Sequence, residues 1–166
     1  RGDGTAFGTN FSLAQPEIAG FSGSLSYSLS RARREGPLGR ERLFDFDQTH
    51  VLNLLLNQSL AGFNFGLRFR VASGTPYTPV IGAYFNAKDD RYEPVFGEHN
   101  GARLPAFYQL DLRAEKQFSF ADWWLRVFLD VQNVTNTENV EELAYAYDYG
   151  APSPVLGLPV FGTLGV

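Results

Sequence analysis

Few residues in this sequence have side chains of the types that perform catalysis or bind metal ions. The chain has two histidines, His50 and His99, and no cysteine, which excludes zinc sites built from thiolates or from several histidines. A hydrolase site would combine His50 with Asp45 or Asp47, but no serine is marked out as its nucleophile. We therefore expect no catalytic residue, no metal ion and no cofactor, and we do not expect an enzyme.

Two segments rich in oxygen atoms remain as candidates for binding. In "NAKDDRYEP" the carboxylates of Asp89, Asp90 and Glu93 could hold calcium, but their spacing is not that of an EF-hand, which favours a solvated acidic turn. The segment "YAYDY" combines aromatic rings with a carboxylate, a combination that suits a sugar or a cationic chelate. Packing against neighbouring loops is the open alternative for these candidate ligand-binding residues: Tyr145, Tyr147, Asp148 and Tyr149.

The elements that must position these residues are predicted to be strands. In "FSGSLSYSLS", residues 21–30, serine occupies every second position, and a strand places such alternating residues on opposite faces. Six segments of roughly ten residues alternate in this way, and a seventh strand is expected to begin near Pro159. No segment has a helical period, and no run of 18 apolar residues could form a transmembrane helix.

The connections between these strands alternate between short and long. Residues 15–20, 58–62 and 119–122 form short turns, whereas residues 31–48, 75–106 and 135–158 form long loops, for which we expect little regular structure beyond short helical turns. Strands of this length, with short turns on one rim and long loops on the other, are typical of an outer-membrane β-barrel. Five arginines make the first long loop basic: Arg31, Arg33, Arg34, Arg40 and Arg42.

Aromatic and charged residues are distributed as a membrane wall requires. Beside the short turns lie aromatic residues that would mark the membrane interface, namely Phe21, Phe63, Phe118, Trp123 and Trp124. One strand face is rich in leucine and valine and would meet lipid. The opposite face carries a ladder of charges that would line the lumen of a barrel: Arg68, Arg70, Asp111, Arg113, Glu115, Arg126 and Asp130. The alternative is a soluble β-domain in which the apolar face is a buried core.

The charge ladder also predicts the register of the hairpin on either side of residues 119–122. Opposite charges on facing strands stabilise a sheet and like charges destabilise it, so Arg113 is not expected opposite Arg126. We favour the register that places Glu115 opposite Arg126, and the second choice places Arg113 opposite Asp130.

Composition limits the class of protein. The 166 residues are enough for one domain, and a net charge of −4 argues against a nucleic-acid-binding surface.

Several segments, in their order along the chain, resemble a known family. "GLRFRVASGTPYTPV", "RLPAFYQLDLRAEKQFSF", "WWLRVFLDVQNVTN" and "GLPVFGTLGV" together are similar to the C-terminal end of a TonB-dependent outer-membrane receptor, and the similarity extends over nearly the whole chain. The resemblance implies strands of a 22-stranded barrel that is closed by a separate plug domain. It also implies energised import of a scarce ligand, such as a metal chelate, a cofactor or an oligosaccharide.

The sequence departs from the family in ways that shape the expected organisation. It contains no plug and no TonB box, it stops at Val166 within the last strand, and seven strands do not satisfy the even count of single-chain bacterial barrels. We therefore expect residues 1–166 to be the C-terminal part of a receptor barrel in the bacterial outer membrane. The expected partners are the lipid bilayer, the remaining strands and plug, TonB and an unknown small ligand. A passive structural or adhesive barrel without a plug is the alternative.

Overall fold

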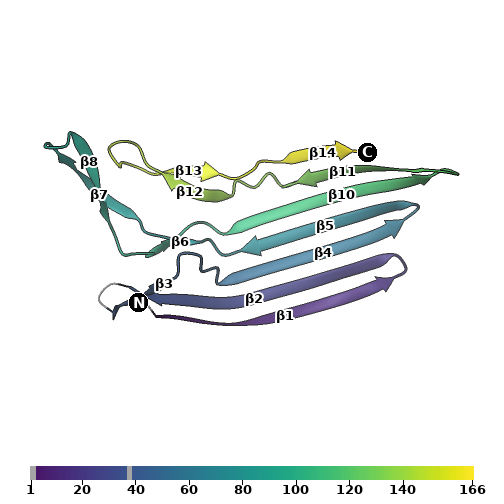
Figure 1. The fold of residues 1–166 in the computed structure, drawn as a ribbon, viewed down its shortest axis with the longest axis horizontal. Helices are drawn as coiled ribbons and strands as arrows, with labels where there is room; N and C mark the ends of the chain where they lie inside the picture. Colours follow the sequence, from purple (N-terminus) through teal and green to yellow (C-terminus); the bar gives the residue numbers. More distant parts are fainter. Residues whose placement is uncertain (1–2, 37–38) are drawn as a thin grey trace.

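The computed structural model describes residues 3–36 and 39–166, and all of its regular elements are β-strands. The main sheet is antiparallel and follows the order of the chain (Figure 1). Its strands are β1 (Gly4–Ile18), β2 (Phe21–Glu35), β4 (His50–Leu60), β5 (Phe63–Ala72), β10 (Phe107–Ser119), β11 (Trp124–Gln132) and β14 (Phe161–Gly165), with β3 (Glu41–Leu43) paired to the end of β2. This arrangement confirms the all-β, antiparallel fold with sequential strands. The described strands form an open sheet, in which β1 and β14 each have one neighbour.

The alternation of side chains divides the sheet into two chemically distinct faces. Cross-strand pairs such as Tyr27 with Leu52 and Phe69 with Leu110 place apolar residues in register from strand to strand. The result is one continuous apolar face and one polar face, because residues directly opposite each other on paired strands share a face. The serines of β2 and the predicted charge ladder lie on the polar face.

The apolar face has no second layer of structure over it. Among the described residues, Ala72 is the single hydrophobic residue classed as buried. Leu112 is 39% exposed and Leu129 47% exposed, while Leu110 and Val127 are half-buried by their neighbours in the sheet. The leucines and valines of this face therefore do not pack into a closed core within this chain. No helix in the described residues is long and apolar enough to cross a membrane.

Two of the short turns are tighter than the sequence predicted. β1 joins β2 through Ala19 and Gly20, and β4 joins β5 through Ala61 and Gly62, all four with positive φ. This is the backbone that type I′ hairpin turns require. β1 continues to Ile18 although it contains Pro16, which has no backbone N–H to donate. The strand tolerates this proline because its pairing with β2 is irregular between Gln15 and Ile18 and because β1 is an edge strand of the described sheet.

The long connections contain more strand than we expected. They hold β6 (Pro76–Tyr77), β7 (Val80–Asn86), β8 (Arg91–Phe96), β9 (Ala102–Arg103), β12 (Val140–Ala144) and β13 (Ser153–Leu156). β6 pairs with β9, β7 with β8, and β12 with β13, so these connections are hairpins that extend beyond the sheet (Figure 1). The expectation that the five arginines lie in a loop was wrong for four of them, since Arg31, Arg33 and Arg34 belong to β2 and Arg42 to β3.

The register of β10 and β11 is the second of the two that we considered, not the one we favoured. Arg113 lies opposite Asp130, and Arg126 lies opposite Gln117 rather than Glu115. The turn sets this register, because the Phe120 N–H donates to the Trp123 carbonyl at 2.8 Å and the two rings stack with centroids 4.0 Å apart. The favoured register would instead have placed Phe120 within the turn. Both registers keep the charges on one face, as the alternation requires.

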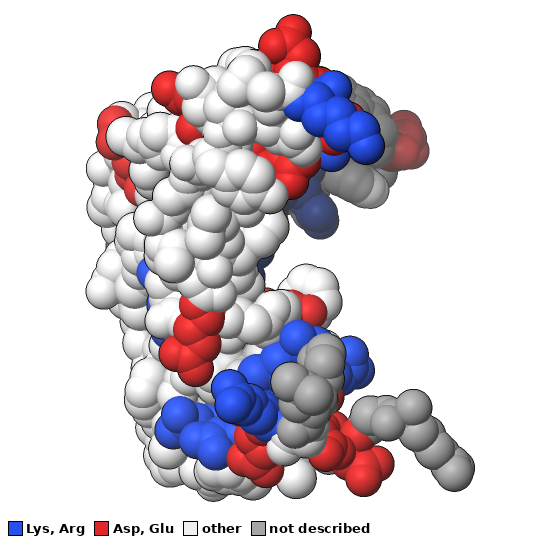
Figure 2. All heavy atoms as spheres, turned by 90° about the vertical axis from the view of Figure 1, so that its left-hand side faces the viewer, with Lys and Arg blue, Asp and Glu red and all other residues white. Residues whose placement is uncertain are grey.

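Seen along the strands from the end that carries the long connections, the molecule is hollowed on one side (Figure 2). Charged side chains border the hollow at both ends, with one cluster of basic side chains over β2 and β3 at the bottom of the view and basic and acidic side chains together at the top.

Candidate functional site

The polar face of β5, β10 and β11 carries two groups of ion pairs. The Arg113 guanidinium donates to Glu115 Oε2 at 3.1 Å and to Asp130 Oδ2 at 3.3 Å, and it lies 4.4 Å from the centre of the Phe128 ring. Arg113 thus joins a neighbour on its own strand to a partner on the facing strand. The Arg126 guanidinium donates to Gln117 at 3.3 Å.

The second group is centred on Asp111, which is 7% exposed. Its Oδ2 accepts from Arg68 Nε at 2.8 Å, and its Oδ1 accepts from Gln109 Nε2 at 2.8 Å and from the Asn133 N–H at 2.9 Å. Because the carboxylate is fully hydrogen-bonded, its burial costs little. Arg70, the remaining member of the predicted ladder, lies over the Phe107 ring at 5.5 Å.

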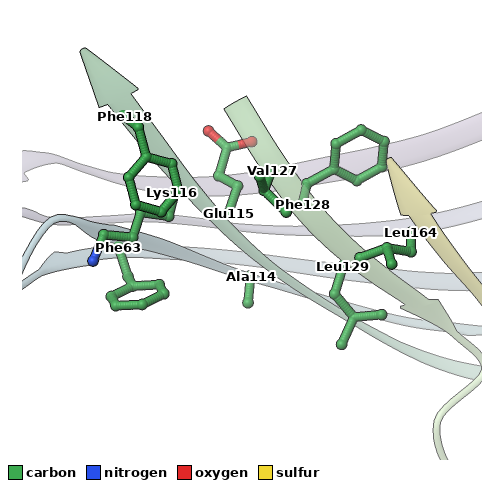
Figure 3. Close-up of a pocket in the computed structure, with 9 residues that line it drawn as sticks. All are labelled: Phe63, Ala114, Glu115, Lys116, Phe118, Val127, Phe128, Leu129 and Leu164. Carbon is green, nitrogen blue, oxygen red and sulfur yellow. The ribbon is translucent and has the colours of Figure 1, made fainter. Parts of the chain in front are cut away.

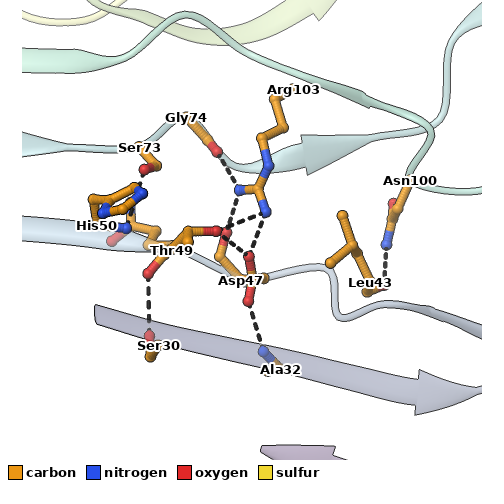
Figure 4. A network of polar contacts seen from close by, with 11 residues as sticks. Ser30, Ala32, Leu43, Asp47, Thr49, His50, Ser73, Gly74, Asn100 and Arg103 are labelled. Carbon is orange, nitrogen blue, oxygen red and sulfur yellow. Dashed lines mark hydrogen bonds and ion pairs between the residues drawn. The ribbon is translucent and has the colours of Figure 1, made fainter. Parts of the chain in front are cut away.

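A network that no sequence motif predicted ties the first long connection to the second (Figure 4). Asp47, 2% exposed, forms an ion pair with Arg103, accepts the Ala32 N–H at 2.7 Å and accepts from the Thr49 hydroxyl at 3.0 Å. Arg103 Nη1 also donates to the carbonyls of Asp47 and Gly74, at 3.0 and 2.9 Å. Asp47 and Arg103 are 56 residues apart in the chain, so this contact fixes two connections relative to each other.

A neighbouring cluster strengthens the same tie. Asn100 Nδ2 donates to the Leu43 carbonyl at 2.8 Å and to Asp45 Oδ1 at 2.6 Å. The ring of His99 is within 3.3 Å of both Asp45 Oδ1 and the Thr78 hydroxyl. The side chains of Asp45 and Asn100 therefore cross-link the β3–β4 connection to the segment that precedes β9.

The surroundings of both aspartates favour their ionised forms. The hydrogen bond from Asn100 is the main cause that holds the pKa of Asp45 below its usual value. Burial raises the pKa of Asp47, but the hydrogen bonds from Arg103, the Ala32 N–H and Thr49 together outweigh burial and place that pKa below its usual value. Both carboxylates are thus acceptors at neutral pH, as the network requires.

This arrangement does not assemble the hydrolase that the sequence left open. The His50 ring Nδ1 lies 2.8 Å from the Tyr27 hydroxyl and stacks against its ring, on the apolar face. Asp45 and Asp47 bond instead to Asn100 and Arg103. His50 instead makes a hydrogen bond at the rim of the sheet, where β4 begins.

The third long connection is fastened through two buried asparagines. Asn133, 3% exposed, donates from Nδ2 to the Thr137 and Leu158 carbonyls, both at 3.0 Å. Asn139 pairs with the backbone of Tyr108 through two bonds, of 2.9 and 2.8 Å. Asn133 of the motif "LDVQNVTN" therefore has a structural role, because its side-chain amide donates both of its hydrogen bonds to backbone carbonyls of the third long connection.

The predicted ligand-binding residues lie beside the hairpin of β7 and β8. The Tyr147 hydroxyl donates to the Asp90 carbonyl at 2.7 Å, and its ring meets that of Tyr92 edge-on at 5.6 Å. Tyr92 in turn packs against Phe85 at 5.2 Å. Tyr147 remains 66% exposed and Phe85 49% exposed. Two loops that are distant in sequence thus form one outward aromatic patch, the Phe85–Tyr92–Tyr147 patch.

Acidic groups accompany this aromatic patch. Hydrogen bonds from Asn86 and Tyr84 lower the pKa of Glu93, with Asn86 Nδ2 and the Tyr84 hydroxyl 2.7 and 2.8 Å from its carboxylate. The other predicted tyrosines turn toward each other, since the rings of Tyr145 and Tyr149 are 6.1 Å apart. Asp148 accepts the Gly150 N–H at 3.1 Å. Among residues 3–36 and 39–166, no group of three or more potential metal-ligating side chains is placed to bind an ion.

The predicted interface aromatics separate between the two faces. Phe21, Phe63 and Phe118 lie on the apolar face close to the short turns, and Trp123 stacks on Phe120 in the turn itself. Trp124 lies opposite Ser119, on the polar face. The Arg126 guanidinium lies 5.3 Å from its ring.

Comparisons with known proteins add no assignment: no protein-family model, no curated protein and no solved structure matches the chain.

Proposed function

We propose that this chain forms part of the wall of a β-barrel in the bacterial outer membrane, and that the barrel is a receptor for TonB-dependent uptake of a scarce ligand. The observation that carries the proposal is the uncovered apolar face, which is continuous over the sequential antiparallel sheet. Soluble proteins rarely leave so large an apolar surface in water. A bilayer covers such a face, and the opposite face meets an aqueous or protein-filled interior.

The two free sheet edges support a larger assembly around this chain. β1 alone has 15 residues with one partner strand, and unpaired backbone groups are costly in lipid. We propose that the remaining barrel strands and a plug domain of the same receptor complete this surface, and that TonB acts through an N-terminal region. The ligand is a metal chelate, a cofactor or an oligosaccharide. It would first contact the Phe85–Tyr92–Tyr147 patch, whose exposed rings suit sugars and cationic groups.

The membrane part of the proposal can be tested by spin labelling, because the natural sequence has no cysteine. Single cysteines are introduced along β11 at Val127, Phe128, Leu129 and Asp130, labelled, and reconstituted in lipid vesicles. Accessibility to oxygen, which concentrates in lipid, is expected at Val127 and Leu129. Accessibility to a water-soluble nickel complex is expected at Phe128 and Asp130. Equal accessibility of both sets to the nickel complex would contradict a membrane wall.

The transport part needs a separate experiment in cells. A strain with the gene deleted is compared with its parent for uptake of three radiolabelled compounds: a ferric hydroxamate chelate, cobalamin and a maltooligosaccharide. Loss of uptake of one compound on deletion of the gene, and equally on deletion of TonB, would support the importer. Gene-dependent uptake that persists without TonB would favour a passive barrel instead.

A further inference from the structure

A groove of about 390 Å³ runs along the apolar face near the short turns (Figure 3). Its floor is Ala114, which lies between Phe65 on β5 and Leu129 on β11. Because the Ala114 methyl group is much shorter than the side chains around it, the sheet surface is indented there. Phe63, Phe118 and Leu164 contribute to the walls.

Lys116 stands at one end of this groove. Its ammonium Nζ lies 4.4 Å from the centre of the Phe63 ring and 5.3 Å from that of Phe118. No carboxylate in the described part of the chain is within ion-pair distance of Lys116. The adjacent Glu115 points to the opposite face (Figure 3). The groove therefore presents a cation with aromatic neighbours and no anionic partner.

We propose that this groove binds one phospholipid with an anionic headgroup, with an acyl chain along Ala114 and the phosphate at Lys116. The inference rests on the proposed membrane location and adds a specific lipid site to it. Lys116 is three residues from the end of β10 at Ser119, or about 10 Å along the strand, which is a suitable depth for a headgroup contact. The phosphate supplies the anion that the protein does not, and the apolar groove matches a hydrocarbon chain in chemistry.

Native mass spectrometry of the reconstituted protein tests this site. The protein is released from vesicles that contain phosphatidylglycerol and phosphatidylcholine with identical chains, and the retained lipids are counted. The wild type should retain phosphatidylglycerol preferentially. Lys116→Gln should lower its retention by about five-fold, the factor expected when one cation beside an anionic lipid is lost. Lys88→Gln, which changes the other lysine of the chain on the exposed β7–β8 turn, is the matched control and should retain lipid as the wild type does.

Two further variants separate the headgroup from the acyl chain. Lys116→Arg keeps the charge and should retain phosphatidylglycerol, whereas Ala114→Phe fills the groove and should reduce retention of both lipids. Leu110→Phe adds bulk elsewhere on the apolar face and should change neither. If Lys116→Gln and Ala114→Phe retain both lipids as the wild type does, the lipid site is refuted.

The outcome also distinguishes this inference from the proposed function. If the spin labels on β11 alternate as expected in the bilayer, but Lys116→Gln and Ala114→Phe leave lipid retention unchanged, the lipid site alone is refuted. A protein that fails to insert would refute the membrane location, and the lipid site with it.

Discussion

Asp47 is a single residue through which three separate segments are connected. It bonds to β2 at Ala32, to Thr49 just before β4, and to Arg103 at the end of β9. Because its carboxylate is nearly inaccessible to water and Arg103 is partly buried, loss of the carboxylate would leave a partly buried cation without its partner.

Replacing Asp47 should therefore loosen the connections without unfolding the sheet. We expect Asp47→Ala to lower the free energy of local opening around Arg103 and Gly74 by about 3 kcal/mol, the usual cost of removing one partner of a buried ion pair. Hydrogen exchange at the amides of 73–75 and 102–104 measures this change. Glu41→Ala is the control, because Glu41 is in an exposed pair with Arg33 and its loss should cost less than about 1 kcal/mol. Equal exchange in the two variants would show that Asp47 does not hold the connections together.

The same residue predicts how the tie depends on pH. The folded-state pKa of Asp47 lies below its usual value of 3.8, so the stabilisation is fully present above that value. It is lost only as the pH falls through the lower, folded-state pKa. The chemical shift of the Ala32 amide proton, which is bonded to Asp47, should be constant from neutral pH to about 4 and change only below it. Asp47→Asn should remove this change, and a midpoint above 3.8 in the wild type would contradict the network.

At the scale of the strand pair, the turn determined the register and the charges accommodated it. Arg113 reaches Glu115 on its own strand as well as Asp130 across from it, so it forms ion pairs in either register. Phe120 and Trp123 form a stacked pair that closes the turn in one of them.

Cross-linking can distinguish the two registers. A double variant with cysteine at Arg113 and Asp130, which are directly opposite, should form a disulfide on oxidation, since the Cα atoms of opposite residues are about 4.5–5.5 Å apart, within the range that a disulfide spans. Cysteines at Glu115 and Arg126 are diagonal in this register and should cross-link much more slowly. Faster cross-linking of the second pair would restore the register that the charges alone suggested. Non-reducing electrophoresis of the reconstituted protein measures both rates.

The strands and their faces were predictable from the sequence because a period of two is a local signal. The apolar alternation in "FNFGLRFRVA" predicted β5, and it placed Arg68 and Arg70 on the polar face. Register depends on small differences between ion pairs and turns, and those are not visible in a pattern. The ion pair of Asp47 and Arg103 joins residues that are distant in the chain. No sequence motif near either residue indicates which residue it pairs with. The Phe85–Tyr92–Tyr147 patch was half predicted, since only its Tyr147 side was identified.

At the scale of the whole molecule, the proposed membrane location predicts that a charged residue introduced on the apolar face destabilises the protein. In water Leu112 is already 39% exposed, so Leu112→Arg would cost almost nothing there. If the face is in lipid, Leu112 lies near the middle of β10 and the same change should destabilise the protein by about 2–4 kcal/mol.

The measurement is the urea midpoint for unfolding of the protein from lipid vesicles. Ser24→Arg on the polar face of β2, which lies opposite Ala14 and Leu55 and has no charged residue across from it, is the control and should shift the midpoint little. Destabilisation confined to Leu112→Arg would support the membrane wall. Similar midpoints for the two variants would indicate that both faces are in water.

The hairpins that extend from the sheet determine how the chain can fold. Ala72 faces Phe107, Pro76 faces Arg103, and Asn86 faces Arg91, so β5–β10, β6–β9 and β7–β8 are nested pairs around one tight tip. Closing β5 against β10 across the whole intervening segment at once would cost considerable loop entropy. If pairing starts at the tip and proceeds inward, each step closes only a few residues. The pairing of β5 with β10 then forms through contacts that are each nearly local. The longest connection is in that case a place where folding can begin rather than an obstacle to it.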